Sequence, residues 1–534
     1  MSAAARLARL DPHAEITVLE RSAHVSYANC GLPYFAGGII PTVEDLLLQT
    51  PPALARRFGL DVRVRHEVRR IDRSARRVDG VDLESGRAFS LDYDYLVLSP
   101  GASPVVPPVP GVERALTLRT VEDAVALRVA ADHHHRALVV GAGFVGLEVA
   151  ESLVTRGLSV TLVEAAEQVL TPLDPELAVL VADELVRHGI DLHLGAGLVR
   201  LDTTTATLAD GSAVPADLAV LAIGVRPDVR LAAEAGLVIG PSGAIAVDEF
   251  QRTSDERIYA VGDAAEKTDP TGATVPIALA NLANRHGRRV ADHIAGLPVS
   301  PVASLGTAIV RVFDLTVALT GFSERRLVAL GRPHLALHTH PASHAGYYPG
   351  AHAMSLKLLV DPRDGAILGA QGVGREGVDK RIDVIATAAR AGLSAPDLAD
   401  LELAYAPPFS SAKDPVNQLG YVAENVLTGL DEVVQWHEVG GLRDAGVALL
   451  DVRTPEEFAR GSVPGARNLP VDELAERLDE VPRDVVVICA VGQRGHVATR
   501  RLRESGVRAR NLSGGYRTWS ASPAAASPPP LCPQ

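Results

Sequence analysis

Two cysteines, Cys30 and Cys489, stand where a thiol could do chemistry. Cys30 follows an apolar, strand-like run at Ile16 to Leu19 and opens the sequence Cys-Gly-Leu-Pro. This sequence is typical of the first turn of a helix, where a proline loses no hydrogen bond. Because a helix N-terminus favours negative charge, we expect a thiolate with a pKa in the lowered range of roughly 3.5–7.5. The alternative is a small buried hydrophobic side chain without a chemical role.

Cys489 ends a second apolar strand, residues 484–488, and begins a loop that reaches Arg494 before a helix predicted from His496. A loop at such a junction turns several backbone N–H groups toward one sulfur and so stabilises a thiolate or persulfide. Arg494 adds positive charge. We therefore expect a sulfur-carrying site, and the alternative is an inert domain of the same fold. The third cysteine, Cys532, is expected to be incidental.

A glycine-rich segment predicts a dinucleotide site. An apolar strand at 137–140 leads into Gly141, Gly143 and Gly146, then a helix at 147–156 and a strand at 159–163 that ends at Glu164. Strand, glycines, helix, strand and terminal acid together fit a dinucleotide cradle. Glu164 should accept both ribose hydroxyls and repel a 2′-phosphate. We therefore expect NADH, with NADPH less favoured.

The N-terminal segment looks like a second such unit without its beginning. Ser2 to Leu10 predicts a helix, Ile16 to Leu19 a strand, and Glu20 the acid that binds ribose. The strand and glycine turn that normally precede this helix are not in the sequence. We expect translation to start further upstream, and we expect a chain that starts at Met1 to bind flavin poorly.

Composition narrows the class of protein. With 534 residues, several domains are expected. The net charge of −13 and the lack of a long basic block argue against nucleic acid. No run of eighteen apolar residues predicts a membrane span. Three cysteines indicate a reducing compartment, so we expect a cytoplasmic protein.

The stretch Ala-Asn-Cys-Gly-Leu-Pro-Tyr around Cys30 resembles the single-cysteine flavin disulfide reductases of the coenzyme A-disulfide reductase type. Relatives with two redox cysteines carry the second one five residues later, where this chain has Phe35. Cys30 would then cycle between a thiolate and a mixed disulfide, persulfide or sulfenate made with the substrate. The segment from Leu430 to Trp519, with its Cys489 loop, resembles the rhodanese, or sulfurtransferase, domain.

This resemblance implies an α/β fold with two Rossmann-like nucleotide-binding domains, an α+β dimerisation domain and a C-terminal α/β rhodanese domain. The expected boundaries are 1–112 and 236–300 for the two parts of the FAD-binding domain, 113–235 for the NAD-binding domain, 301–426 for the dimerisation domain, 430–520 for the rhodanese domain and 521–534 for a disordered tail.

The resemblance also assigns roles. Asp263, at a strand end, would accept hydrogen bonds from the flavin ribityl chain, and Glu20, Asn29 and Gly101 would complete the FAD site. A helix from Pro276 to Arg289 would face the flavin ring. Three tyrosines would reach the partner's active cysteine in a homodimer and handle protons, or would be amphipathic interface aromatics: Tyr347, Tyr348 and Tyr405.

The sequence thus predicts an FAD-dependent, NADH-driven reductase of coenzyme A disulfide, coenzyme A persulfide or polysulfide, coupled to a sulfurtransferase domain. Arg6 and Arg9 would hold the substrate's phosphates, although two such arginines are more often solvated charges. One alternative is an NADH oxidase or peroxidase that uses a cysteine sulfenate. A sulfur carrier with an inactive reductase scaffold is another.

Overall fold

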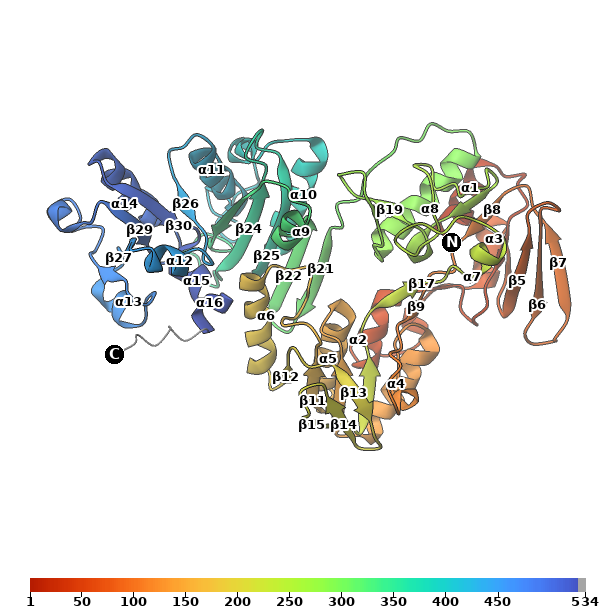
Figure 1. Ribbon diagram of the computed structural model, residues 1–534. Coiled ribbons are helices and arrows are strands. Elements are labelled where there is room, and N and C mark those ends of the chain that lie inside the picture. The colour runs from red at the N-terminus through yellow and green to blue at the C-terminus, as the bar shows by residue number, and fades with distance from the viewer. Residues whose placement is uncertain (527–534) are drawn as a thin grey trace. The chain divides into compact units, whose positions relative to one another are not determined.

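The computed structural model describes residues 1–526, so the predicted disorder of residues 527–534 and the role of Cys532 lie outside the described residues (Figure 1). The described chain forms two compact units. Unit 1 comprises residues 1–165 and 189–306, and unit 2 comprises residues 166–188 and those from Thr307 onward. The stretch 166–188 therefore packs with unit 2, although it lies within the predicted NAD-binding range. None of the described helices is long and apolar enough to cross a membrane.

Unit 1 contains a parallel four-stranded sheet in the order β12 (Asp191–His193), β11 (Ser159–Val163), β10 (Arg136–Val140) and β16 (Leu218–Leu221). Strands β10 and β16 are almost wholly buried apolar residues, as expected for a sheet covered on both faces. The helices of this unit are α1 (Ser2–Leu10), α2 (Leu32–Ala36), α3 (Pro51–Phe58), α4 (Val121–His133), α5 (Phe144–Thr155), α7 (Arg230–Glu234) and α8 (Ala280–Ile294).

The remaining strands of unit 1 form smaller sheets. Two are parallel pairs, β1 (Thr17–Leu19) with β4 (Asp61–Arg63) and β18 (Ile258–Ala260) with β8 (Leu96–Leu98). Two are antiparallel triplets, β5 (His66–Asp72), β6 (Arg77–Asp82) and β7 (Ala88–Asp92), and β13 (Leu198–Leu201), β14 (Thr205–Leu208) and β15 (Ala213–Pro215). Three are antiparallel pairs, β2 (Ser26–Tyr27) with β3 (Leu47–Gln49), β9 (Ala102–Pro104) with β17 (Val225–Pro227), and β19 (Lys267–Thr268) with β20 (Thr274–Val275).

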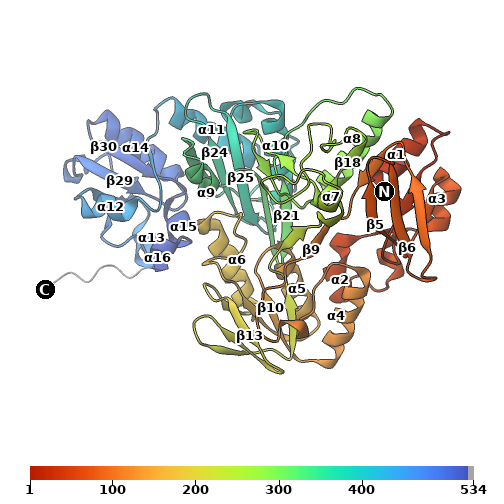
Figure 2. The same cartoon turned by 45° about the vertical axis from the view of Figure 1, so that its right-hand side comes forward.

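Unit 2 begins with α6 (Pro175–Arg187) and an antiparallel sheet in the order β21 (Ala308–Val312), β22 (Leu315–Gly321), β25 (Ile367–Gly374), β24 (Met354–Val360) and β23 (Leu335–Thr339). Helices α10 (Val378–Ala391) and α11 (Pro415–Leu427) share one apolar core with β24 (Figure 2). A shorter helix, α9 (Glu324–Ala329), follows β22.

The last part of unit 2 is a parallel sheet in the order β26 (Val433–Val434), β30 (Arg508–Leu512), β29 (Asp484–Ile488), β27 (Ala448–Asp451) and β28 (Arg467–Asn468). Alternate residues of β29 face opposite cores. Val485 and Val487 pack with α14 (Gln493–Glu504), whereas Val486 and Ile488 pack with α12 (Val439–Asp444) and α15 (Gly515–Ser520). Two short helices complete this part, α13 (Pro455–Ala459) and α16 (Pro523–Ala526).

Several predicted bounds were wrong. The helix expected from Pro276 begins at Ala280, because Thr274 and Val275 still pair in an extended hairpin before the proline. The helix expected from His496 begins at Gln493, since Gly492 adopts a left-handed conformation that starts it earlier. The tail is not disordered from residue 521, because α16 continues the described chain to residue 526.

Candidate functional site

Cys30 lies on a short 3₁₀ turn, η1 (Asn29–Gly31), which leads directly into α2. The turn is held by the N–H of Ala28, which donates to the carbonyl of Leu46 at 2.8 Å. On the other side, Leu32 and Phe35 are buried and anchor the helix. Cys30 itself is exposed, as is Asn29 beside it. The fold therefore fixes the backbone of the cysteine and leaves its sulfur accessible.

The electrostatics at Cys30 differ from the expectation of a favoured thiolate. Partial burial, followed by the negative charges of Glu148 and Asp263, raises the pKa of the Cys30 thiol above its ordinary value, and Arg119 offsets this only in part. The predicted lowering was therefore wrong for the protein as the structure shows it. The reason is that partial burial of the sulfur disfavours the charged thiolate, and the negative charges of Glu148 and Asp263 add to this effect.

Arg119 is a residue that the sequence interpretation missed. Its Nη2 lies 3.5 Å from the Asp263 carboxylate, and its Nε donates to the carbonyl of Ala102 at 2.9 Å. A Cβ added at Gly101, whose φ is +78°, would come within 2.7 Å of the guanidinium. Gly101 thus leaves room for the one nearby cation that acts on both Asp263 and Cys30.

A second missed residue is Glu148, which lies two positions after Gly146 on helix α5. The hydroxyl of Tyr34 donates to its Oε1 at 3.1 Å. Burial raises the pKa of Glu148 above its ordinary value, and the hydrogen bond from Tyr34 lowers it in part. Sequence alone offered one clue, since Tyr34 is part of the Cys-Gly-Leu-Pro-Tyr stretch and lies one helical turn after the cysteine.

The predicted glycine cradle fits a dinucleotide. Gly141 has a φ of +104°, and a Cβ at Gly146 would lie 1.8 Å from the Gly141 carbonyl oxygen, so neither position accepts a side chain. At Gly143 an added Cβ would meet nothing within 4 Å, which leaves the cradle open. Glu164 follows β11, and its Oε2 accepts the N–H of Ala142 at 2.7 Å. A carboxylate thus lies at the cradle, where it can receive ribose hydroxyls.

Asp263, the residue predicted to bind the flavin ribityl chain, lies in the 3₁₀ turn η4 (Gly262–Ala264) after β18. Burial lowers the pKa of Lys267 to about 8, and its ammonium donates to the carbonyls of Gly262 and Ala265 under this turn. The Arg119 guanidinium lies 3.5 Å from the Asp263 carboxylate, and the buried Lys267 ammonium interacts with the same charge; the carboxylate oxygens are acceptors that suit hydroxyl donors. These residues fit a ribityl chain.

The first helix and its surroundings interact within the chain. Arg6 donates to Asp292 at 2.7 Å, and the guanidinium of Arg9 lies 5.7 Å from the ring centroid of Phe58. Glu20 follows β1, and its Oε1 accepts the N–H of Ser22 at 2.6 Å. A phosphate-binding role for the two arginines and a flavin role for Glu20 stay predictions.

The predicted tyrosines lie together in unit 2. The hydroxyls of Tyr347 and Tyr405 are 3.0 Å apart, and both side chains are exposed, by 76% and 49%. Their hydrogen bond raises the pKa of Tyr347 above its ordinary value. Tyr348 packs edge-on against His344, with ring centroids 5.6 Å apart. The structure therefore brings Tyr347 and Tyr405 into one phenol pair and places Tyr348 beside it.

Cys489 lies at the end of β29 and is 1% exposed. The N–H of Gly492 lies 3.1 Å from its Sγ and donates to it. Gly495 lies next to the sulfur, because a Cβ added there would be 3.5 Å from Sγ. The same Cβ would lie 2.2 Å from Asn511 Oδ1, so this position has no room for a side chain. Among the described hydrogen bonds one backbone N–H, that of Gly492, donates to the buried sulfur, so the expectation of several such donors stays a prediction; α14 begins at the next residue, Gln493.

Arg494, which the sequence analysis expected to add positive charge near Cys489, interacts electrostatically with that cysteine and also forms an ion pair with Glu457. Both of its terminal nitrogens donate to Glu457, each at 2.7 Å. Glu457 also accepts the N–H of Thr454 in the capping box of α13, and its pKa is lowered to about 2, first by Arg494. Glu457 therefore caps α13 and pairs with Arg494 at the same time.

Asp451 forms a second buried polar centre beside the loop. It is fully buried and accepts donors from Arg453 at 2.7 Å and from the Ser462 hydroxyl at 2.5 Å. Arg453 also lies 4.3 Å from the ring centroid of Tyr516. The Ser462 hydroxyl thus acts as a donor to the buried Asp451 carboxylate.

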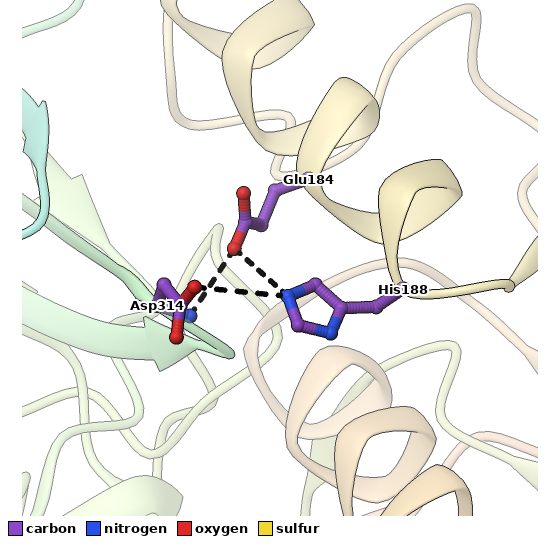
Figure 3. Close-up of side chains that lie close together, drawn as sticks. All are labelled: Glu184, His188 and Asp314. Atoms are coloured by element: carbon purple, nitrogen blue, oxygen red, sulfur yellow. Dashed lines mark hydrogen bonds and ion pairs between the residues drawn. The ribbon is translucent and has the colours of Figure 1, made fainter.

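One cluster of acidic and histidine side chains has a spacing that could suit a metal ion (Figure 3). Glu184 Oε1 lies 3.2 Å from His188 Nε2, which is 4.0 Å from Asp314 Oδ2. However, Arg187 pairs with both carboxylates, and Arg375 lies 3.5 Å from Asp314. The carboxylate charges are therefore already compensated by guanidinium groups, and the arrangement is an ion-pair cluster.

Three family models cover most of the chain. Residues 1–287 match the pyridine nucleotide-disulphide oxidoreductase model, residues 307–415 match its dimerisation domain, and residues 436–522 match the rhodanese-like domain. The chain therefore belongs to the pyridine nucleotide-disulphide oxidoreductase family and carries a C-terminal rhodanese-like domain. The resemblance and the α/β fold class predicted from the sequence are confirmed.

Individual relatives narrow the class further. The coenzyme A disulfide reductase of Staphylococcus haemolyticus is 34% identical over 427 residues, which cover 79% of this chain and 96% of that protein. The reduced CoADR-RHD of Bacillus anthracis is 45% identical, with a TM-score of 0.96 over 97% of this chain and 95% of the other. A NAD-dependent persulfide reductase from A. fulgidus is 38% identical, with a TM-score of 0.90 over 97% of both chains.

Proposed function

We infer that the chain is a flavoprotein that uses NAD(P)H to reduce coenzyme A-type disulfides or persulfides through Cys30, coupled to a sulfurtransferase domain at Cys489. The observation that carries this inference is the pairing of two different thiol sites in one chain. One is an exposed cysteine with a buried Phe35 where a second redox cysteine would stand. The other is a buried thiol wrapped by backbone N–H.

The chemistry at Cys30 follows from the phenylalanine at position 35, where two-cysteine relatives carry the second redox cysteine. Its thiolate attacks a disulfide sulfur, forms a mixed disulfide and releases the first thiolate. Two electrons from NADH and a proton then cleave the mixed disulfide, release the second thiol and restore the Cys30 thiolate. With a persulfide the products are a thiol and hydrogen sulfide. FAD, when bound near Asp263, supplies the two-electron relay between nicotinamide and sulfur.

NADH is the proposed reductant because of Glu164. A carboxylate at the end of β11 favours two ribose hydroxyls and repels a 2′-phosphate. The same argument ranks NADPH lower. Replacing Glu164 with Gln should narrow the difference between the two nucleotides in kcat/KM, and an unchanged ratio would contradict this role.

The tyrosine pair and the dimerisation domain support a homodimer. In this proposal Tyr347 and Tyr405, with Tyr348 beside them, extend toward the partner's Cys30 and donate a proton to the leaving thiolate. Their exposure in one chain supports this role, because such a phenol pair is free to meet another surface.

The composition further supports a cytoplasmic location.

At Cys489 the proposed reaction is sulfur transfer. The thiolate takes a sulfane sulfur from a donor such as thiosulfate, forming an enzyme persulfide and releasing sulfite. A carrier thiolate, such as that of coenzyme A, then attacks the outer sulfur and leaves as a persulfide. The N–H of Gly492 stabilises the negative sulfur in both states.

The reductase proposal is tested by steady-state oxidation of NADH. Coenzyme A persulfide, coenzyme A disulfide and oxygen are offered as separate acceptors to the flavin-loaded protein. We expect a sulfur acceptor to give the highest kcat/KM and Cys30→Ser to abolish it. Faster turnover with oxygen would instead favour an NADH oxidase. Sulfur transfer without any NADH-linked reduction would favour the sulfur carrier.

A further inference from the structure

A buried polar chain connects the dimerisation sheet to the turn under the Cys489 loop. His338, on strand β23, has a side chain that is 2% exposed. Its Nδ1 lies 3.0 Å from the hydroxyl of Ser513, and its backbone N–H donates to the same oxygen at 3.2 Å. Ser513 directly follows β30 of the rhodanese-like domain. One residue of the dimerisation domain thus holds the end of a rhodanese strand through one side-chain contact and one backbone contact.

The Nε2 side of the His338 ring is also held by hydrogen bonding. Its Nε2 lies 2.9 Å from Glu176 Oε1, and the same oxygen accepts from the Lys357 ammonium at 2.6 Å. Lys357 is fully buried among three carboxylates. Burial alone would lower its pKa, but Glu176, with Asp174 and Glu324, raises it above the ordinary value. Because Glu176 is a carboxylate, Nε2 must carry the proton, and the ring orientation is set.

The turn that Ser513 begins lies against the catalytic loop. The N–H of Tyr516 donates to the carbonyl of Cys489 at 2.7 Å, and the N–H of Arg517 donates to the carbonyl of Ala490 at 3.0 Å. A Cβ added at Gly515 would lie 2.4 Å from the Cys489 carbonyl oxygen. Any shift of this turn therefore shifts the backbone that carries the sulfur.

His338 and the turn at residues 513–518 also pack closely against each other. A Cβ added at Gly514 would lie 2.7 Å from the Cβ of His338. Two further contacts join the same surfaces: Gln435 donates to the carbonyl of Ala336 at 2.8 Å, and His340 Nε2 lies 2.8 Å from the Thr518 hydroxyl. The 513–518 turn is thus held from the dimerisation sheet at several points.

We propose that His338 is a positioning residue for sulfur transfer at Cys489, acting through Ser513 and the turn that supports the Cys489 loop. The rhodanese-like domain then works as a docked part of unit 2, and its active-site geometry depends on a residue outside the domain. This inference rests on the proposed sulfur-transfer function of Cys489. It adds a determinant that the rhodanese segment alone, residues 436–522, does not contain.

The test replaces His338 in the full-length, flavin-loaded protein and measures thiosulfate-dependent sulfur transfer. His338→Ala should lower kcat about 10- to 100-fold with little change in KM, the range expected when a reacting group is displaced by roughly 1 Å. NADH-linked reduction through Cys30 should be unchanged. The pH profile of Cys489 alkylation should also move, because the N–H of Gly492 would no longer be held on the sulfur.

Conservative variants separate positioning from general packing. In His338→Asn the amide replaces Nδ1 and can still reach Ser513, so we expect it to restore most of the lost kcat. In His338→Gln the amide reaches toward Glu176 instead and should not restore it. The matched control is His334→Gln, because the contacts of the His334 ring in the described structure are with Glu324 of the same network and with the Arg332 carbonyl, and not with the rhodanese turn. This variant should keep wild-type sulfur transfer.

Ser513→Ala provides an independent variant if His338→Ala does not fold. It should lower kcat similarly, and the double variant should be no worse than either single one. Unchanged sulfur transfer and alkylation in Ser513→Ala, or rescue by Gln rather than Asn, would overturn the proposal. Failure of the proposed sulfur-transfer function can be told apart from failure of the His338 inference. In the first case wild type would transfer no sulfur, or Cys489→Ser would still transfer it. The pH profile of Cys489 alkylation would still report whether His338 positions the loop.

Discussion

The pairing of Arg494 with Glu457 should set how strongly the Cys489 site binds anionic sulfur donors. Replacing Glu457 with Gln removes the carboxylate that now holds both guanidinium nitrogens at 2.7 Å. The freed charge can then act on a dianion such as thiosulfate. At about 4 Å, one pair of unit charges is worth about 1 kcal/mol even in water-like surroundings. Since the Arg494 side chain is 35% exposed, we use this lower limit.

An energy of about 1 kcal/mol corresponds to roughly a fivefold change in affinity. We therefore expect Glu457→Gln to lower the KM for thiosulfate at least about fivefold, and the gain should shrink at high salt. The assay is thiosulfate-dependent sulfur transfer at low and high ionic strength. Glu456→Gln is the matched control, because it makes the same charge change on the same helix without touching Arg494. Equal KM values in the two variants, or a higher KM in Glu457→Gln, would refute the reasoning.

Three further predictions concern other parts of the molecule. Glu148→Gln should lower the pKa of Cys30, because it removes a negative charge that raises it; alkylation of Cys30 should then reach its half-maximal rate at lower pH than in wild type, and no shift would contradict the assignment. Gly146→Ala should weaken NADH binding by at least tenfold in titrations, because its Cβ would lie 1.8 Å from a carbonyl oxygen; unchanged affinity would show that the cradle is not used. Lys357→Met should destabilise the fold by about 3–5 kcal/mol in urea unfolding, because buried carboxylates lose their cation, whereas Lys413→Met, at an exposed lysine, should not.

Much of the nucleotide-binding architecture could be predicted from the sequence, because the residues that determine it lie close together in the chain. The apolar run at 137–140, the glycines after it and the acid at Glu164 each follow from backbone sterics and short-range periodicity. The strand predicted at 159–163 has the predicted bounds in the structure. Cys489 could be placed for the same reason, since a buried strand and a glycine-containing loop define its position.

Contacts between distant segments could not be predicted. The approach of Glu148 to Cys30 depends on how α2 packs against α5, and the pattern around either residue does not encode that distance. Together with the partial burial of the sulfur, which is the larger cause, it raises the thiol pKa where a lowering was expected. Likewise, the pairing of Arg494 with Glu457 could not be predicted, because Glu457 lies 37 positions earlier in the chain. Long-range pairing of charges was the main information that sequence patterns lacked.

The buried network around Lys357 shows the same limit. A lysine in an apolar strand is hard to interpret alone, because it can be an edge residue or a buried charge. Only the fold brings Glu176 and Glu324 to it from separate segments, and only then does His338 gain its fixed orientation.

The central claim is that the two cysteines carry separate half-reactions. The most direct test measures both activities in the same two variants of the flavin-loaded protein: sulfur transfer from thiosulfate, and NADH-linked reduction of preformed coenzyme A persulfide. We predict that Cys489→Ser loses the first and keeps the second, whereas Cys30→Ser keeps the first and loses the second. Full NADH-linked persulfide reduction by Cys30→Ser would contradict the account.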